Sequence, residues 1–397
     1  MGAKIIKYFK QLSITRKVIF ILITILVIAY IFCLPRQLFH VPYSTVVTDR
    51  NGELLGARIA SDGQWRFPPR NTTPEKIKQC LITFEDRHFY HHWGVNPFAI
   101  GRAFYQNVKN KRIVSGGSTL TMQTIRLARN KSRTFGEKFI EMILATRLEF
   151  RASKEKILSM YVSHAPFGGN VVGLDAAAWR YFGHSAEELC GAGQAVPVPW
   201  AEAAMLAVLP NAPAMIHLSK SRQSLLNKRN RLLKQLYGRK IIDSSTYELA
   251  ISEPLPDEPH PLPQIAPHLV SRFYQERNGK YSVSTIDRGI QTQIENAAER
   301  WSNEFNRSDI RNLAILVIDI QTNQVVAYCG NVNFKRKQSG NQVDVIQAPR
   351  STGSILKPFL YYAMLQEGSL LPHTLLPDIP ININGFTPQN FSLQFGI

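Results

Sequence analysis

Two adjacent carboxylates, Glu85 and Asp86, lie in a short segment that is otherwise rich in aromatic and imidazole side chains, Glu85–Gly94. A carboxyl group that is partly removed from water has a raised pKa, and its ionised form is then a stronger base. This composition is suited to general-base catalysis. The same residues would also form the polar end of a helix in which Arg87 pairs with a carboxylate, so the segment alone leaves both interpretations open.

A second segment, Gly116–Gln123, has two glycines followed by hydroxyl side chains at the expected start of a helix. Free backbone N–H groups and the positive end of the helix dipole suit such a start to anion binding. It is not a nucleotide-binding P-loop, because the Lys-Ser/Thr ending is absent. The alternative is an ordinary glycine turn capped by Ser118.

A third segment, Lys138–Glu149, is predicted to be a helix on which Lys138, Glu141 and Ala145 share one face. The small Ala145 leaves room beside the Glu141 carboxylate. The alternative is a surface salt bridge between Lys138 and Glu141.

A different chemistry is suggested by Ser354 and Lys357, which form a Ser-x-x-Lys pair. On a helix this spacing places the amine one turn from the hydroxyl, where a neutral amine could take its proton. The pattern is short enough to arise by chance, so its interpretation depends on the surrounding sequence.

Most of the elements that position these residues are helical. Helical periodicity extends from Pro74 to about Trp200, after a region of short strands at 43–66. A proline-rich run at 253–263 cannot continue a helix and is expected to be a semi-rigid linker. Beyond it, a helix at 288–305 followed by two strands indicates the beginning of an α/β domain.

The composition indicates that the binding partners of this protein are anionic. The 397 residues carry a formal net charge of +18, which favours nucleic acid, anionic lipid or diphosphate-bearing substrates. The four cysteines have no metal-ligand spacing, so no protein-built metal site is predicted, and a disulfide between Cys80 and Cys190 stays open.

The first 35 residues indicate a membrane anchor. Basic residues precede an uncharged run, Val18–Leu34, which Pro35 ends. The run is at the short end of what spans a bilayer, and the positive-inside rule keeps 1–17 cytoplasmic and places the rest outside. A cleaved signal peptide is the rival interpretation, but residues 29–33 offer no small-x-small cleavage site. A single span with an outward domain argues against nucleic acid as a partner.

The three chemical segments, together with Ser153–Tyr161, occur in the order found in one family. They resemble the peptidoglycan glycosyltransferase domain of class A penicillin-binding proteins, and the stretches 165–170 and 207–213 resemble the 1C subgroup. The resemblance implies a mostly α, lysozyme-like fold that polymerises lipid II into a β-1,4 glycan strand and releases undecaprenyl diphosphate. Glu85 would be the general base and Glu141 the second carboxylate of an inverting reaction.

The resemblance also implies which residues bind the diphosphate and sugar and which support the base. They are Asp86, Phe89, His92, Gly117, Ser118, Thr119, Gln123, Arg126 and Lys138. The chain departs from the family at Met122, where glutamine is usual, at Arg126, where lysine is usual, and at Ser159 and Ser163. Arginine does not simply replace lysine at a diphosphate site, so these changes bear on the rate.

A second resemblance, from Tyr281 to the end, is to the start of the penicillin-binding transpeptidase domain. The Ser-x-Asn and Lys-Thr-Gly motifs of that family are absent, so we expect Ser354 and Lys357 to be vestigial. The predicted order is a tail at 1–17, an anchor at 18–34, a glycosyltransferase domain at 49–245, a proline-rich linker at 251–268 and an incomplete transpeptidase domain at 281–397.

Two other functions stay open at this stage: a lysozyme-like hydrolase or lytic transglycosylase, and a non-catalytic scaffold that binds lipid II. The expected partners are lipid II, the growing glycan strand, the cytoplasmic membrane and other wall-synthesis proteins. No cofactor is assigned with certainty, although Mg²⁺ or Mn²⁺ is compatible with a diphosphate. The basic amphipathic segment Phe98–Arg112 suits either a membrane interface or a protein core.

Overall fold

The structure is a computed structural model that describes residues 13–110, 116–132, 134–190, 194–197, 199–211, 219–334, 340–390, 392 and 394–395. Residues 1–12 of the predicted tail, together with Lys111, Arg112 and residues 212–218, therefore lie outside the described residues. The chain divides into two compact units, Met1–Ile346 and Gln347–Ile397, which are considered separately.

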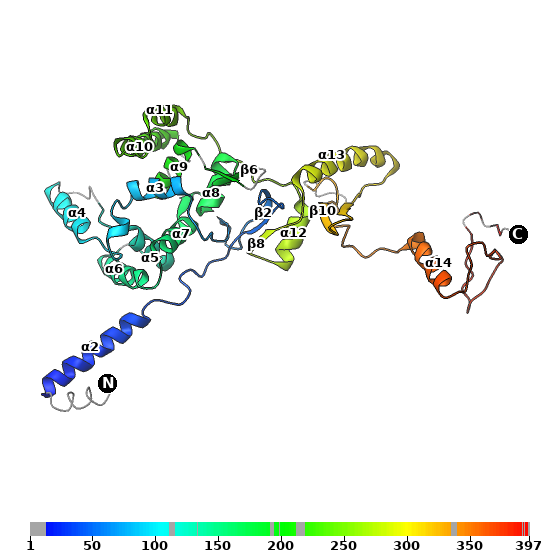
Figure 1. Cartoon of the computed structure of the whole chain (residues 1–397), viewed down its shortest axis with the longest axis horizontal. Helices are drawn as coiled ribbons and strands as arrows, with labels where there is room; N and C mark the ends of the chain where they lie inside the picture. The colour runs from blue at the N-terminus through cyan, green and yellow to red at the C-terminus, as the bar shows by residue number, and fades with distance from the viewer. Residues whose placement is uncertain are drawn as a thin grey trace. The chain divides into compact units, whose positions relative to one another are not determined.

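The first helix of the described residues is α2 (Ile14–Phe32), an apolar helix that Figure 1 shows near the N-terminus. None of its residues is buried. Among the described residues it is the one helix whose length and hydropathy would allow it to cross a membrane, a test that a signal sequence also passes. Its end contacts the next domain: the Tyr30 hydroxyl donates to Thr146 Oγ1 at 3.0 Å, and Arg147 Nε donates to the Ile31 carbonyl at 3.1 Å.

Three short strands form one sheet. Strand β1 (Thr45–Thr48) pairs antiparallel with β2 (Leu54–Arg58) and parallel with β8 (Tyr281–Val283). The turn between β1 and β2 forms because Asp49 Oδ1 accepts backbone N–H groups of Asn51 and Glu53, both at 2.8 Å.

The helical region is built around a largely apolar central helix, α9 (Trp200–Val208), in which Glu202 is the one charged residue. Every residue from Ala203 to Val208 is buried, and α9 packs on α3, α8, α10 and α11. The other elements of this region are α3 (Glu75–Phe84), η1 (Phe89–His91), α4 (Pro97–Lys109), α5 (Leu120–Arg129), α6 (Phe135–Glu149), α7 (Lys154–His164), α8 (Leu174–Phe182), η2 (Leu209–Asn211), α10 (Ser219–Gly238) and α11 (Ser244–Ser252). Side-chain caps begin five of them: Asn96 before α4, Thr119 before α5, Thr134 before α6, Ser153 before α7 and Asp243 before α11.

Two small sheets complete this region. One joins β3 (Trp65–Arg66), β5 (Val171–Val172) and β4 (Pro166–Gly168); the other pairs β6 (Glu187–Cys190) with β7 (Gln194–Pro197). Cys80 is a buried, free thiol.

The proline-rich segment is held against the helical region by arginines. Arg222 of α10 donates to the Leu255 and Pro256 carbonyls at 3.2 and 2.6 Å. The backbone N–H of His260 donates to the Arg180 carbonyl at 2.6 Å, and the Arg180 guanidinium donates to the His260 carbonyl at 2.5 Å.

After this segment come α12 (Pro267–Glu276), α13 (Arg288–Phe305), η4 (Asn306–Ser308), β9 (Ile315–Asp319) and β10 (Gln324–Cys329). Strands β9 and β10 form an antiparallel pair. A second core joins this part to the first strands, because Val47 and Leu55 pack with Leu269, Ile286 and Tyr328.

The second unit contains η6 (Gly353–Leu356) and α14 (Lys357–Gln366). No residue of η6 or α14 is buried, although α14 carries several large apolar side chains. The fold class predicted from the sequence is confirmed: an apolar N-terminal helix, a mostly helical domain, and a few strands of a mixed region.

Candidate active site

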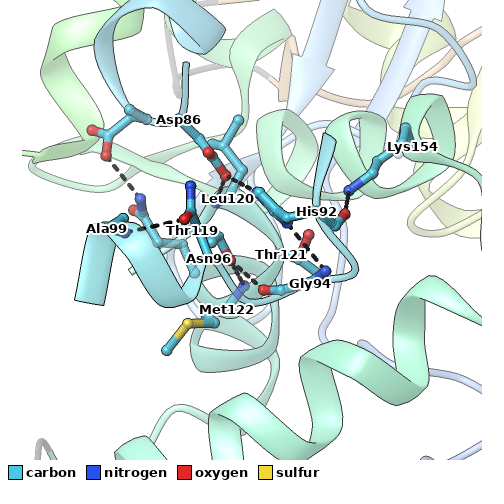
Figure 2. A network of polar contacts seen from close by, with 12 residues as sticks. Asp86, His92, Gly94, Asn96, Ala99, Thr119, Leu120, Thr121, Met122 and Lys154 are labelled. Atoms are coloured by element: carbon cyan, nitrogen blue, oxygen red, sulfur yellow. Dashed lines mark hydrogen bonds and ion pairs between the residues drawn. The ribbon is translucent and has the colours of Figure 1, made fainter. Parts of the chain in front are cut away.

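The end of α3, the start of α5 and the middle of α6 bring the predicted carboxylates and the predicted anion site together. Glu85 follows α3 directly, and Thr119 caps α5 by accepting the Met122 backbone N–H at 3.1 Å. The cap is therefore Thr119, where the sequence suggested Ser118. Figure 2 shows the buried polar network beneath this site, with Asp86, His92, Thr119 and Leu120 converging from the two loops.

Asp86 links the loop after α3 to the start of α5. Its Oδ2 accepts both the His92 Nε2–H at 2.9 Å and the Leu120 backbone N–H at 3.1 Å. The His92 tautomer follows from its other nitrogen: Nδ1 accepts the Gly94 N–H at 3.2 Å, so Nε2 carries the proton. Asp86 is buried, and its contact with His92 is therefore fixed in the interior.

The network continues on both sides (Figure 2). Thr119 Oγ1 donates to the Gly94 carbonyl at 2.5 Å, and Lys154 Nζ donates to the His92 carbonyl at 2.7 Å. The same amine donates to Glu149 Oε1 at 2.8 Å, which also accepts the Thr121 hydroxyl at 2.6 Å. Four segments of the chain are thereby held in one arrangement.

Phe89 supports this arrangement from the core side. Its ring is fully buried, lies edge-on to the His92 ring, and has the Lys154 ammonium 4.6 Å from its centroid. The predicted supporting role of Phe89 and His92 therefore has a definite geometry.

Two glycines allow the segments to approach. A Cβ on Gly117 would lie 2.8 Å from the Ile100 Cα. A Cβ on Gly94, which has φ +84°, would lie 2.6 Å from the Ala145 carbonyl oxygen. A glycine is therefore required at position 94, where the loop approaches the backbone of α6 at Ala145.

Glu85 is held by two carboxamides on different elements. Gln123 Nε2 donates to Oε2 at 2.8 Å, and Asn211 Nδ2 donates to Oε1 at 3.3 Å. Burial raises the pKa of Glu85 above its ordinary value of 4.5, opposed by the hydrogen bonds from Gln123 and Asn211. The charge of Asp86 raises the pKa further, and that of Arg126 lowers it. Gln123, predicted as a substrate ligand, contacts the base.

Glu141 is engaged by Arg126. The guanidinium Nε and one terminal nitrogen donate to the two carboxylate oxygens at 2.9 and 3.0 Å. The same terminal nitrogen donates to Ser118 Oγ at 3.1 Å. Arg126 thereby connects the predicted anion-binding turn to the second carboxylate.

Lys138 lies apart from this pair. It is exposed, and among the described residues the ion pair of Glu141 is with Arg126 rather than with Lys138. The alternative of a Lys138–Glu141 salt bridge came from their i,i+3 spacing on one helix, whereas a pair between two helices leaves no such spacing in the sequence. The substrate-binding role predicted for Lys138 stays a prediction.

The described residues do not form a metal site by themselves. Both oxygens of Glu141 accept from Arg126, and within the described parts of the chain there is no group of three or more metal-binding side chains. The site offers the Arg126 guanidinium and the Ser118 hydroxyl to an anion.

Sequence reasoning assigned no role to Asn211, Lys154, Glu149 or Thr121. All four lie inside segments that resemble family motifs, and this position was the one signal in the sequence that could have pointed to them. Their roles were missed because the contacts join residues distant in the chain, such as Glu85 and Asn211.

Residues 51–237, which contain this site, match the Transglycosylase family. The chain is 34% identical to penicillin-binding protein 1C of Escherichia coli, over 91% of this chain and 46% of that protein. These matches confirm the predicted resemblance to the class A penicillin-binding proteins.

Other relatives agree. Penicillin-binding protein 1A of Aquifex aeolicus is 34% identical over 54% of this chain and 28% of that protein, and penicillin-binding protein 1B of E. coli is 29% identical over 87% and 42%. The crystal structure of penicillin-binding protein 1A from Haemophilus influenzae aligns at 16% identity with a TM-score of 0.33, a value too low to establish a shared fold by itself; the alignment covers 90% of this chain and 58% of that one. The chain spans less than half the length of these curated relatives.

Proposed function

We propose that this chain is a peptidoglycan glycosyltransferase that polymerises lipid II and releases undecaprenyl diphosphate. The observation that carries the proposal is the position of Glu85. The pKa of this carboxylate is raised, and two side chains donate to it. One of them, Gln123, belongs to α5, the helix that also carries Arg126 beside Ser118.

In the proposed reaction, Glu85 takes the proton from the acceptor sugar's 4-hydroxyl. The oxygen of that hydroxyl attacks the anomeric carbon of the donor at the same time. The bond to the diphosphate oxygen breaks on the opposite face, so an α-linked donor gives a β-1,4 product. Ser118 and Arg126 would stabilise the negative charge on the leaving diphosphate.

Glu141 has a supporting role in this mechanism. Because its carboxylate is bound by Arg126, it orients the guanidinium and does not act as a free acid or base. A divalent cation would have to be held mainly by the diphosphate itself. Polymerisation in the presence of EDTA tests whether a cation is required.

The membrane is the proposed source of the substrate. Helices α4 and α6 expose large apolar side chains, which are Phe98, Phe104, Tyr105, Val108, Phe135, Phe139 and Ile143. The end of α6 also contacts the end of α2 through Tyr30 and Thr146. We place these faces in the interface of the cytoplasmic membrane, on its outer side, where a lipid-tailed substrate enters. Release of the chain by carbonate or high salt would contradict this.

One assay separates this function from its alternatives. Purified full chain incubated with labelled lipid II gives polymer if the proposal holds, shortened glycan from preformed strands if the chain is a hydrolase, and bound but unchanged lipid II if it is a scaffold. The anion site favours synthesis, because hydrolysis of a glycan strand releases no diphosphate.

A further inference from the structure

Asn211 is placed by the buried central helix of the domain. It ends the η2 turn, which continues directly from the buried helix α9, and Leu209 at the start of that turn is fully buried. The side chain itself is exposed and reaches the carboxylate of Glu85, 126 residues away in the sequence.

The two oxygens of Glu85 have different surroundings. Oε2 accepts the shorter bond, 2.8 Å from Gln123 Nε2, and Gln123 is partly buried. Oε1 accepts the longer bond, 3.3 Å from Asn211 Nδ2, and Asn211 is exposed. Because a carboxylate oxygen has two lone pairs, Oε1 can accept a second donor beside Asn211.

We propose that Asn211 is a positioning residue for the proposed glycosyl transfer: it holds Oε1 of Glu85, the oxygen that receives the acceptor's proton, in place. This inference rests on the proposed function and adds a residue to it. The carboxylate is fixed in its plane by one donor from α5 and one from η2, so it needs no reorganisation when the sugar hydroxyl arrives.

Asn211 also affects how strongly basic Glu85 is. Its hydrogen bond favours the ionised form, together with Gln123 and Arg126, against burial and the neighbouring charge of Asp86. A further titratable group that interacts with Glu85 is Tyr161 on α7, whose pKa burial raises well above 10 and which therefore stays neutral. Loss of Asn211 should raise the pKa of Glu85, so that less of the base is ionised at neutral pH.

The test compares Asn211→Leu with wild type in the full chain. A hydrogen bond to a charged group is worth enough to reduce the rate by roughly tenfold or more when it is lost. We expect that loss in the initial rate of lipid II polymerisation at neutral pH, with the acid limb of the pH–rate profile displaced to higher pH. Asn211→Asp should displace it further through like-charge repulsion and regain activity at alkaline pH, and Asn211→Ser should restore part of the rate.

The matched control is Asn227→Leu, at an exposed asparagine of α10 whose side chain accepts from Gln223 rather than contacting Glu85. A direct readout is the carboxyl ¹³C titration of Glu85, assigned by its loss in Glu85→Gln, which should move upward in Asn211→Leu. An unchanged pH profile and titration in Asn211→Leu would overturn the inference while leaving the proposed function intact. A wild-type chain that makes no polymer would instead overturn the proposed function, and the titration would still report on Asn211.

Discussion

The surroundings of Glu85 and of Ser354 differ in how many parts of the chain contribute contacts and in how much is buried. Around Glu85, side chains from α3, α5, η2 and α6 are joined by contacts that span up to 126 residues of sequence, and Asp86, Phe89 and His92 are buried. Ser354 lies in η6 and Lys357 begins α14; both side chains are exposed, and no residue of these two elements is buried. Correct spacing supplies the reactive groups, but burial and fixed donors give them altered reactivity.

The largest effect should come from Glu85→Gln. The amide keeps the shape of the side chain and cannot accept a proton, so lipid II polymerisation should fall about a hundredfold or more while lipid II binding survives. Initial rates and a binding assay with labelled lipid II measure the two properties. Polymerisation at the wild-type rate would exclude Glu85 as the base.

The pH dependence of the wild-type rate tests the same residue without mutation. Burial raises the pKa of Glu85 above 4.5, so the base is lost as pH falls through that raised value. The midpoint of the acid limb of the pH–rate profile should therefore lie above 4.5. Well below that midpoint Glu85 is fully protonated, and the loss of rate should be complete. An acid limb at or below the ordinary glutamate value would show that Glu85 is not desolvated.

Asp86→Leu should break the network below the base. It leaves the His92 Nε2–H and the Leu120 N–H without their acceptor in a buried region, at a cost of about 1–3 kcal/mol for each group. We expect a lower thermal unfolding midpoint together with a reduced polymerisation rate. Asp62→Leu, which removes an ion pair with Arg66 outside the site, is the control and should leave the rate near wild type.

Arg126→Lys should have a smaller effect. A lysine keeps the charge but loses the paired contact with Glu141 and the link to Ser118, so the rate should fall about tenfold. Arg129→Lys is a closely matched control, since Arg129 makes a similar two-point pair with Glu137 on the same helix pair. Equal losses in the two variants would mean that Arg126 acts only on stability.

Ser354→Ala should change nothing in polymerisation. The exposed Ser354 and Lys357 lack buried neighbours within η6 and α14, so we also expect no labelling of the chain by fluorescent penicillin. Gel fluorescence beside the lipid II assay measures both. Specific labelling that disappears in Ser354→Ala would show that this region forms a working acylation site.

Much of this arrangement could be predicted from local patterns. The helix that begins after Pro74, the helix at 288–305 and the turn at 49–52 follow from residue types a few positions apart. The location of Glu85 beside the Gly117–Gln123 turn came from the family resemblance. The pairing of Arg126 with Glu141 and of Asn211 with Glu85 could not be predicted, because each depends on how separate helices pack.

The pairing of β1 with β8 sets an order of events during synthesis. The strand at Thr45–Thr48 lies among the first residues after the apolar helix, yet its parallel neighbour is Tyr281–Val283. At about 5–20 residues per second, the ribosome needs roughly 10–50 seconds to make the intervening chain. During that interval one edge of β1 is without its partner. The helical domain can therefore finish folding around α9 before β1 pairs with β8.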